Sequence, residues 1–176
     1  MSDDNDDFFL EDLGGDKPKR KNSGKKGKRG EGNLCQILSA RFPDREAFSR
    51  VIGSGAHWRE SLAEVAKQAM VGDIVCPAGF RFAIESKFGY DKIDLAAAFT
   101  SGNKQIDGFL EQVSKDAARS GRQPLLCWRK PRQQWIAFGK FAIASATYEL
   151  KYREWRAVAL AELLTQPDEY FFKNSV

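Results

Sequence analysis

Asp73, Glu85 and Lys87 are charged side chains within residues 71–90 (VGDIVCPAGFRFAIESKFGY), a segment that otherwise predicts two apolar strands. Because side chains alternate across a strand, Glu85 and Lys87 share one face of the second strand. If the two strands form a hairpin, Asp73 comes close to both at one edge of the sheet. The spacing therefore predicts a cluster of two carboxylates and one ammonium.

A fourth ionisable side chain, Glu31, can join this cluster. It falls on the apolar stripe of a helix expected over residues 31–42, where its carboxylate either complements the helix dipole or points inward at a cationic group. Converging carboxylates repel one another and raise each other's pKa unless a cation lies among them. Oxygen ligands without a suitable His or Cys favour Mg²⁺, with Mn²⁺ as the other choice.

Phosphodiester hydrolysis is the chemistry that such a site supports. A divalent cation polarises a phosphoryl oxygen and supplies hydroxide near neutral pH, and Lys87 would lie beside the attacking water. The alternative interpretation is a surface ion pair between Glu85 and Lys87, with Asp73 as an ordinary turn residue. The hairpin spacing, the inward Glu31 and the basic chain favour the catalytic interpretation.

The order of the predicted elements indicates an α/β fold with a mixed central β-sheet flanked by helices. Gly and Pro residues separate segments that have strand or helix periodicity. Helices are expected over residues 31–42, 59–70 and 103–121, and strands over residues 47–56, 72–77, 80–87, 124–130 and 134–139. Residues 141–164 fit a short strand followed by a helix, and residues 167–176 are expected to pack only in part.

Composition separates a tail from a single domain in this chain of 176 residues with a net charge of +4. Residues 1–30 are acidic and then rich in Lys, Arg, Gly and Ser, which predicts a disordered tail that either aids solubility and targeting or attracts nucleic-acid phosphates. Residues 31–176 are expected to form the domain. The single His and the spacing of the three Cys argue against a zinc site or a His-based triad. No apolar run is long enough to predict a membrane span.

Asp73 followed by Glu85-Ser86-Lys87 resembles the motif of the PD-(D/E)-x-K nuclease superfamily. The order of elements over residues 26–138 is similar to that of the archaeal-type Holliday junction resolvases within it. Those proteins share a basic, Gly-rich lead-in to an early helical Glu, and a strand that ends in a Gly-Ser turn. This chain departs from the motif at Gly72, where the family has Pro. The resemblance implies a restriction-endonuclease-like fold.

The resemblance also implies roles for the clustered residues. Asp73 and Glu85 would bind Mg²⁺ together with the backbone carbonyl of Ser86. Lys87 would position the attacking water, and Glu31 would complete the acidic cluster directly or through water.

Further residues follow from the same resemblance. Gln112 would support the site from the helix after the lysine strand. Ser54 would face the scissile phosphate or the cluster, or would be an ordinary turn serine. Arg50 would contact the DNA backbone or lie in solvent. Other candidates for phosphate contacts, each of which could equally be a solvated surface residue, are Lys28, Arg29, Lys104, Arg129, Lys130 and Arg132.

The implied activity is a Mg²⁺-dependent DNA endonuclease that resolves Holliday junctions or branched DNA by paired cuts. A resolvase would be a two-fold homodimer, and residues 88–102 predict either a buried crossover or a self-association surface. Two other functions stay open: a restriction-like, repair or nicking nuclease of the same superfamily, and a non-catalytic DNA-binding module. We expect a cytoplasmic protein of a bacterial or phage-infected cell.

Overall fold

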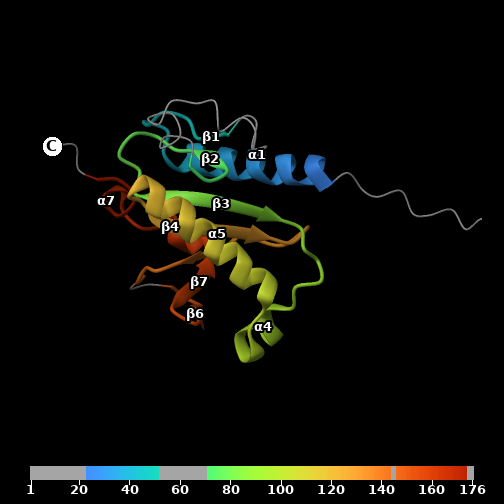
Figure 1. Ribbon diagram of the computed structural model, residues 1–176. Coiled ribbons are helices and arrows are strands. Elements are labelled where there is room, and N and C mark those ends of the chain that lie inside the picture. Colours follow the sequence, from blue (N-terminus) through green and yellow to red (C-terminus); the bar gives the residue numbers. More distant parts are fainter. Residues whose placement is uncertain (1–22, 52–70, 144–145, 174–176) are drawn as a thin grey trace, which may run out of the picture.

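The computed structural model describes residues 23–51, 71–143 and 146–173 (Figure 1). Its centre is a five-stranded sheet with the order β3-β4-β5-β7-β6. β3 and β4 are parallel, and the other neighbouring strands are antiparallel. The strands are β3 (Phe82–Phe88), β4 (Gln123–Arg129), β5 (Ile136–Gly139), β6 (Leu150–Tyr152) and β7 (Trp155–Ala159). The prediction of an α/β fold with a mixed sheet flanked by helices is confirmed.

Helices cover both faces of this sheet. They are α1 (Ser23–Arg41), α4 (Leu95–Ser101), α5 (Lys104–Ser120), α6 (Leu160–Leu163) and α7 (Asp168–Phe171). Buried side chains of α1, α6 and α7 form one core with Phe82 and Ile84 of β3. Those of α4 and α5 form a second core with Leu126 and Trp128 of β4. The predicted alternation along β3 is thus observed, because Glu85 and Lys87 face α5 while Phe82 and Ile84 face α1.

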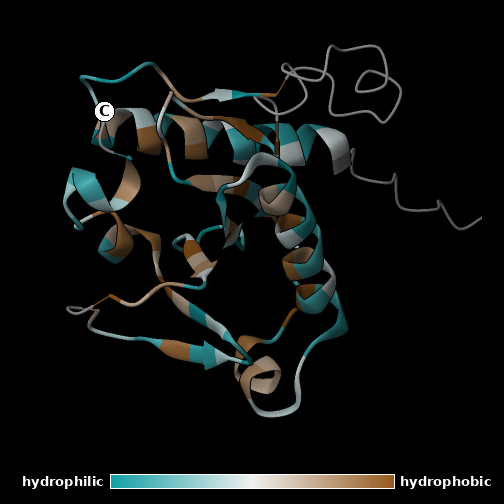
Figure 2. Cartoon of the chain, turned by 60° about the vertical axis from the view of Figure 1, so that its left-hand side comes forward, coloured by the Kyte–Doolittle hydropathy of each residue, from teal (hydrophilic) through white to brown (hydrophobic). Residues whose placement is uncertain are grey.

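The first helix begins at Ser23, eight residues before the predicted start at Glu31, so part of the expected basic tail is helical. These turns are polar, whereas the later turns of α1 carry hydrophobic residues (Figure 2). Gly30 lies directly against β3, because a Cβ there would be 2.3 Å from the Cβ of Phe88. Lys26 also reaches Asp91, with 3.4 Å between Nζ and Oδ2. Contacts with residues distant in sequence therefore extend the helix beyond what composition predicts.

The helix predicted over residues 103–121 is confirmed as α5. The side chain of Asn103 caps its N-terminus by accepting hydrogen bonds from two backbone N–H groups. Gly121 ends it in the left-handed conformation, with φ of 62°. α5 lies in the connection between the parallel strands β3 and β4, which need such a crossover. It therefore spans the face of β3 that carries the charged residues.

The hairpin predicted between residues 72–77 and 80–87 is wrong. β2 (Ile74–Val75) pairs instead with β1 (Ser49–Arg50), and the two form a separate antiparallel sheet. A single backbone hydrogen bond, from the N–H of Asp73 to the carbonyl oxygen of Ile84 at 2.9 Å, still joins this segment to β3. The helix expected over residues 59–70 lies outside the described residues.

The C-terminal part also differs from the prediction. Within residues 141–164 the described chain forms β6 and β7 as a hairpin, followed by α6, rather than one strand and one helix. Phe171 and Phe172 are 1% and 4% exposed, so the end of the chain is packed more fully than expected. Phe172 bridges to Phe80, just before β3. Among the described helices, none has the length and hydropathy that a membrane span requires.

Candidate active site

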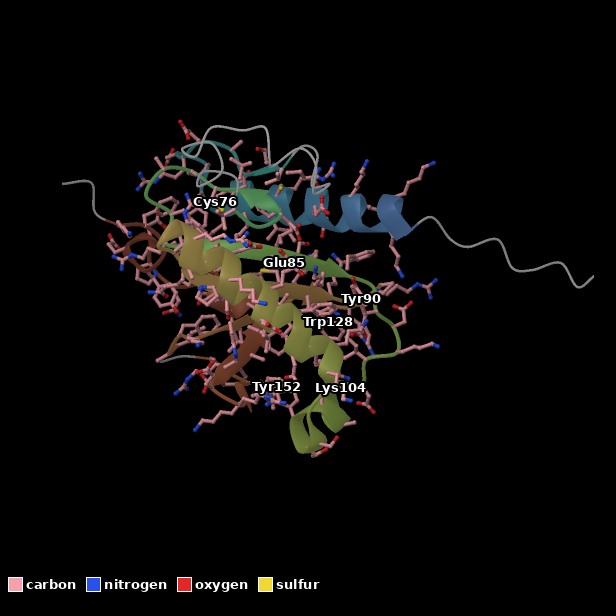
Figure 3. The ribbon with its side chains drawn as sticks, viewed as in Figure 1. Cys76, Glu85, Tyr90, Lys104, Trp128 and Tyr152 are labelled. Carbon is pink, nitrogen blue, oxygen red and sulfur yellow. The ribbon has the colours of Figure 1, made fainter. Side chains whose placement is uncertain are left out.

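Asp73, Glu85 and Lys87 lie together where β3 passes beneath α5, and Figure 3 shows Glu85 at this position. The Lys87 ammonium donates a hydrogen bond from Nζ to Glu85 Oε1 at 2.5 Å. The backbone N–H of Ser86 donates to Asp73 Oδ2 at 2.9 Å. The predicted juxtaposition of Asp73 with the charged face of β3 is therefore present, although it does not arise from a regular hairpin.

Gly72 explains how Asp73 reaches this position. Its φ is +81°, and a Cβ at Gly72 would lie 2.3 Å from the carbonyl oxygen of Ile84. Only glycine adopts this conformation at such close range without strain. Proline, which occupies the equivalent position in the superfamily motif, holds φ near −65° and could not replace it here. The departure from the motif thus follows from the local backbone geometry.

Burial is the largest influence on the pKa of both carboxylates. Burial, and then the charge of Asp73, raise the pKa of Glu85 to about 7, against the opposing effect of Lys87. Burial likewise raises the pKa of Asp73, although the Ser86 N–H and Lys87 lower it. For Lys87, burial favours the neutral amine, but Glu85 and Asp73 outweigh it and the pKa is raised. The pair therefore tends to retain a proton near neutral pH.

The donor set fits a hard divalent cation. Glu85 is 1% exposed, and its Oε2 has no hydrogen-bond partner among the described residues. A buried carboxylate oxygen without a partner is costly, and a second carboxylate beside it increases the cost. A cation bound between Asp73 and Glu85 would remove both penalties, and oxygen ligands suit Mg²⁺ or Mn²⁺.

α5 completes the site from above. Gln112 donates from Nε2 to Glu85 Oε1 at 2.7 Å, and its Oε1 accepts from Lys87 Nζ at 3.1 Å. Gln112 therefore lies where the prediction of a supporting residue requires. The ring of Phe109 also faces Lys87, with 5.2 Å between Nζ and the ring centre.

Sequence reasoning missed Phe109 and Asp116 as neighbours of the cluster. Asp116 is 6% exposed, and its charge contributes to the raised pKa of Glu85. Phe109, Gln112 and Asp116 are spaced by three and four residues, so they share one face of α5. Helical spacing from Gln112 was the signal that could have identified both residues.

Glu31 does not enter the cluster. Its Oε2 accepts a hydrogen bond from Nε of Arg50 at 2.7 Å. The described residues contain no group of three His, Cys, Asp or Glu side chains that could hold a metal ion. The charge of Glu31 nevertheless raises the pKa of Asp73, so the two carboxylates lie within electrostatic range of each other.

The other predicted residues are dispersed. Ser54 lies outside the described residues. Lys28 and Arg29 are exposed on α1, and Arg132 is exposed after β4. Figure 3 shows Lys104 far along α5 from Glu85. Lys130 and Arg129 have partners within the fold. Lys130 Nζ lies 5.8 Å from the ring centre of Trp128, and Arg129 donates from Nη1 to Asn33 Oδ1 at 2.7 Å.

Comparison with known proteins identifies a family and a similar solved structure. Residues 22–169 match the family model described as "Phage putative PDDEXK endonuclease". No curated protein matches the chain. A solved structure with similarity is that of Hjc from Archaeoglobus fulgidus, a Holliday junction resolvase from an archaeal hyperthermophile, with 18% identity, 76% of this chain and 86% of that chain covered, and a TM-score of 0.36. Because the family model spans most of the sequence, the chain belongs to the phage PDDEXK endonuclease family, and the resemblance to the PD-(D/E)-x-K superfamily is confirmed.

Proposed function

We propose that the protein is a Mg²⁺-dependent DNA endonuclease, with Mn²⁺ able to replace Mg²⁺, and that Asp73, Glu85 and Lys87 carry the reaction. Superfamily membership supports a nuclease that uses a divalent metal on DNA. The observation that carries the finer proposal is that Oε2 of Glu85, buried beside a second carboxylate, has no hydrogen-bond partner in the part of the chain that the structure describes. A site built only for stability would not bury these charges together.

Asp73 and Glu85 would hold the metal through their carboxylate oxygens, with the Ser86 carbonyl as a further ligand. When bound, the metal polarises a phosphate oxygen and lowers the pKa of water. The Lys87 ammonium, held by Glu85 and Gln112, orients the attacking water through its remaining N–H donor. Gln112 fixes the positions of the Glu85 and Lys87 side chains, because its side-chain amide makes a hydrogen bond with each.

A cleavage assay with labelled DNA tests the proposal. Asp73→Asn and Lys87→Ala should each lower the Mg²⁺-dependent cleavage rate by at least about 100-fold while leaving DNA binding largely intact. Lys115→Ala is the matched control, since Lys115 is an exposed lysine of α5 that pairs only with Glu111 in the described structure. Wild-type rates in the two site variants would refute the assignment. DNA binding without any cleavage in Mg²⁺ or Mn²⁺ would instead support the non-catalytic module.

Branched or four-way DNA is the proposed substrate class. Support comes from the sequence resemblance of the Gly-rich lead-in, the early helical Glu31 and the Gly-Ser turn to the resolvase pattern. Paired, symmetric nicks in a synthetic four-way junction, with linear duplex spared, are expected. Equal cleavage of linear duplex would favour a restriction-like, repair or nicking nuclease of the same superfamily.

Paired cuts need two active sites, and we propose a homodimer formed through β6. Tyr148 and Leu150, 80% and 48% exposed, lie at this edge of the described sheet. A pocket of about 290 Å³ adjoins them and is lined in part by Leu95 and Phe99 of α4. Two antiparallel copies of β6 that cross at Leu150 would place Glu149 of each copy opposite Lys151 of the other.

Molecular mass in solution tests this interface. Lys151→Glu should weaken the dimer by placing like charges opposite each other, and Lys151→Arg, which keeps the positive charge, should retain it. Leu150→Asp should give a monomer. A monomeric wild type, or a dimer that is indifferent to Lys151→Glu and Leu150→Asp, would refute this interface.

A further inference from the structure

Glu31 and Arg50 form an ion pair next to the segment that carries Asp73, with 2.7 Å between Nε of Arg50 and Oε2 of Glu31. Arg50 lies on β1, where it pairs with Ile74, the residue after Asp73. The next N–H along β1, that of Val51, donates to the carbonyl oxygen of Asp73 at 3.0 Å. The side chain of Arg50 lies against α1 at Gly32, because a Cβ there would be 3.9 Å from its Cδ. β1 therefore holds the backbone of Arg50 beside the segment that carries Asp73, while the Arg50 side chain turns to Glu31 on α1.

The two partners differ in their access to solvent. The side chain of Arg50 is 35% exposed, whereas that of Glu31 is 16% exposed. A guanidinium at this exposure can be reached by a phosphodiester, which it binds in a two-pronged geometry. Partly exposed ion pairs stabilise a fold only weakly, so exchange of the carboxylate for a phosphate is feasible. The exchange would leave Glu31 without a cation beside a site that binds one.

We propose that Arg50 is a positioning residue that withholds Glu31 from the metal site until a DNA backbone phosphate binds Arg50. The released Glu31 carboxylate then completes the acidic site, directly or through water. This inference depends on the proposed function of the site. It predicts that DNA and metal strengthen each other's binding, since coupling between two ligands is reciprocal.

Binding of Mn²⁺ to the free protein tests the first half of the proposal without any cleavage. The free Mn²⁺ signal in electron paramagnetic resonance reports the bound fraction. Arg50→Gln should tighten Mn²⁺ binding by about tenfold, because it releases Glu31. Arg50→Lys, which keeps the positive charge, should return the affinity toward the wild-type value. Glu31→Gln should leave the affinity unchanged, and the double variant should match Glu31→Gln.

The second measurement adds DNA to a protein in which Arg50 is not substituted. In a Lys87→Ala background, which blocks cleavage, a short duplex should raise the Mn²⁺ affinity by a factor similar to that of Arg50→Gln. The same duplex should have no further effect once Arg50→Gln is present. Circular dichroism and thermal unfolding establish that each variant is folded.

The outcomes separate this inference from the proposed function. Mn²⁺ binding that is lost in Asp73→Asn but indifferent to Arg50→Gln and to DNA would overturn the coupling and leave the metal site intact. A loss of affinity in the free Glu31→Gln variant would also overturn it, since Glu31 would then bind metal without DNA. Absence of Mn²⁺ binding that depends on Asp73 would overturn both proposals.

Discussion

Replacing Glu85 with Gln should stabilise the metal-free protein at high pH and abolish its activity. In the fold the pKa of Glu85 is raised from 4.5 to about 7, so the folded state holds its proton more tightly than the unfolded chain does. The stability that this carboxyl contributes is fully present below pH 4.5 and is lost as the pH rises through about 7. At 1.36 kcal/mol for each pH unit, the loss is about 3 kcal/mol.

Denaturant unfolding in a chelating buffer, at about pH 5 and about pH 8, measures the effect. The advantage of Glu85→Gln over wild type should grow by about 2.5 kcal/mol between these conditions, because the unfolded chain has already lost most of this proton at pH 5. Mg²⁺ should restore much of the wild-type stability at the higher pH, since a ligand of the folded state stabilises it. Glu111→Gln is the control, because Glu111 is exposed on α5 and its pKa is lowered by Lys115. An advantage that is flat with pH, or that reverses sign, would refute the assignment of Glu85 as a repelled, buried carboxylate.

Four other substitutions test the site and the packing around it. Gln112→Ala should lower the cleavage rate about tenfold with DNA binding unchanged, and a wild-type rate would exclude a supporting role. Gly30→Ala should cost about 1–3 kcal/mol in denaturant unfolding, because its Cβ would lie 2.3 Å from that of Phe88. At Gly108 an added Cβ would meet no atom within 4 Å, so Gly108→Ala should instead stabilise the protein by about 0.5–1 kcal/mol through the higher helix propensity of Ala. If both variants lost stability, the contact with Phe88 would not be the cause of the loss at Gly30. Phe171→Ala should lower the free energy of unfolding by about 3–5 kcal/mol. A small change in thermal unfolding would mean that α7 is not part of the core.

Local signals predicted the elements that carry the site. Asn103 and Gly121 cap α5 as their types suggest, and alternation along β3 identified which side chains face each other. Both signals act within one element and need no knowledge of its neighbours. The cluster of Asp73 with Glu85 and Lys87 was predicted from a hairpin that does not form; a backbone hydrogen bond from Asp73 to Ile84 joins the two segments instead.

Pairing and packing between distant segments could not be predicted. β2 is only two residues long and pairs with β1, and nothing in its sequence distinguishes this partner from β3. The early start of α1 depends on Gly30 lying against Phe88, a contact across the fold. The β6–β7 hairpin was missed because residues 141–164 fit helix and strand periodicity about equally well. In each case the missing information was the identity of the neighbouring segment.

Glu31 combines a signal within one helix with a contact between distant segments. Its position on the apolar stripe of α1 predicted either a helix-dipole charge or a carboxylate that points at a cation, and the structure supplies the cation as Arg50. Periodicity therefore indicated the direction and the charge of the partner. It could not distinguish a guanidinium from a metal ion, because both satisfy the same carboxylate. If a phosphate binds the guanidinium of Arg50, the Glu31 carboxylate loses its cation while it lies within electrostatic range of Asp73, and a metal ion would then replace the guanidinium.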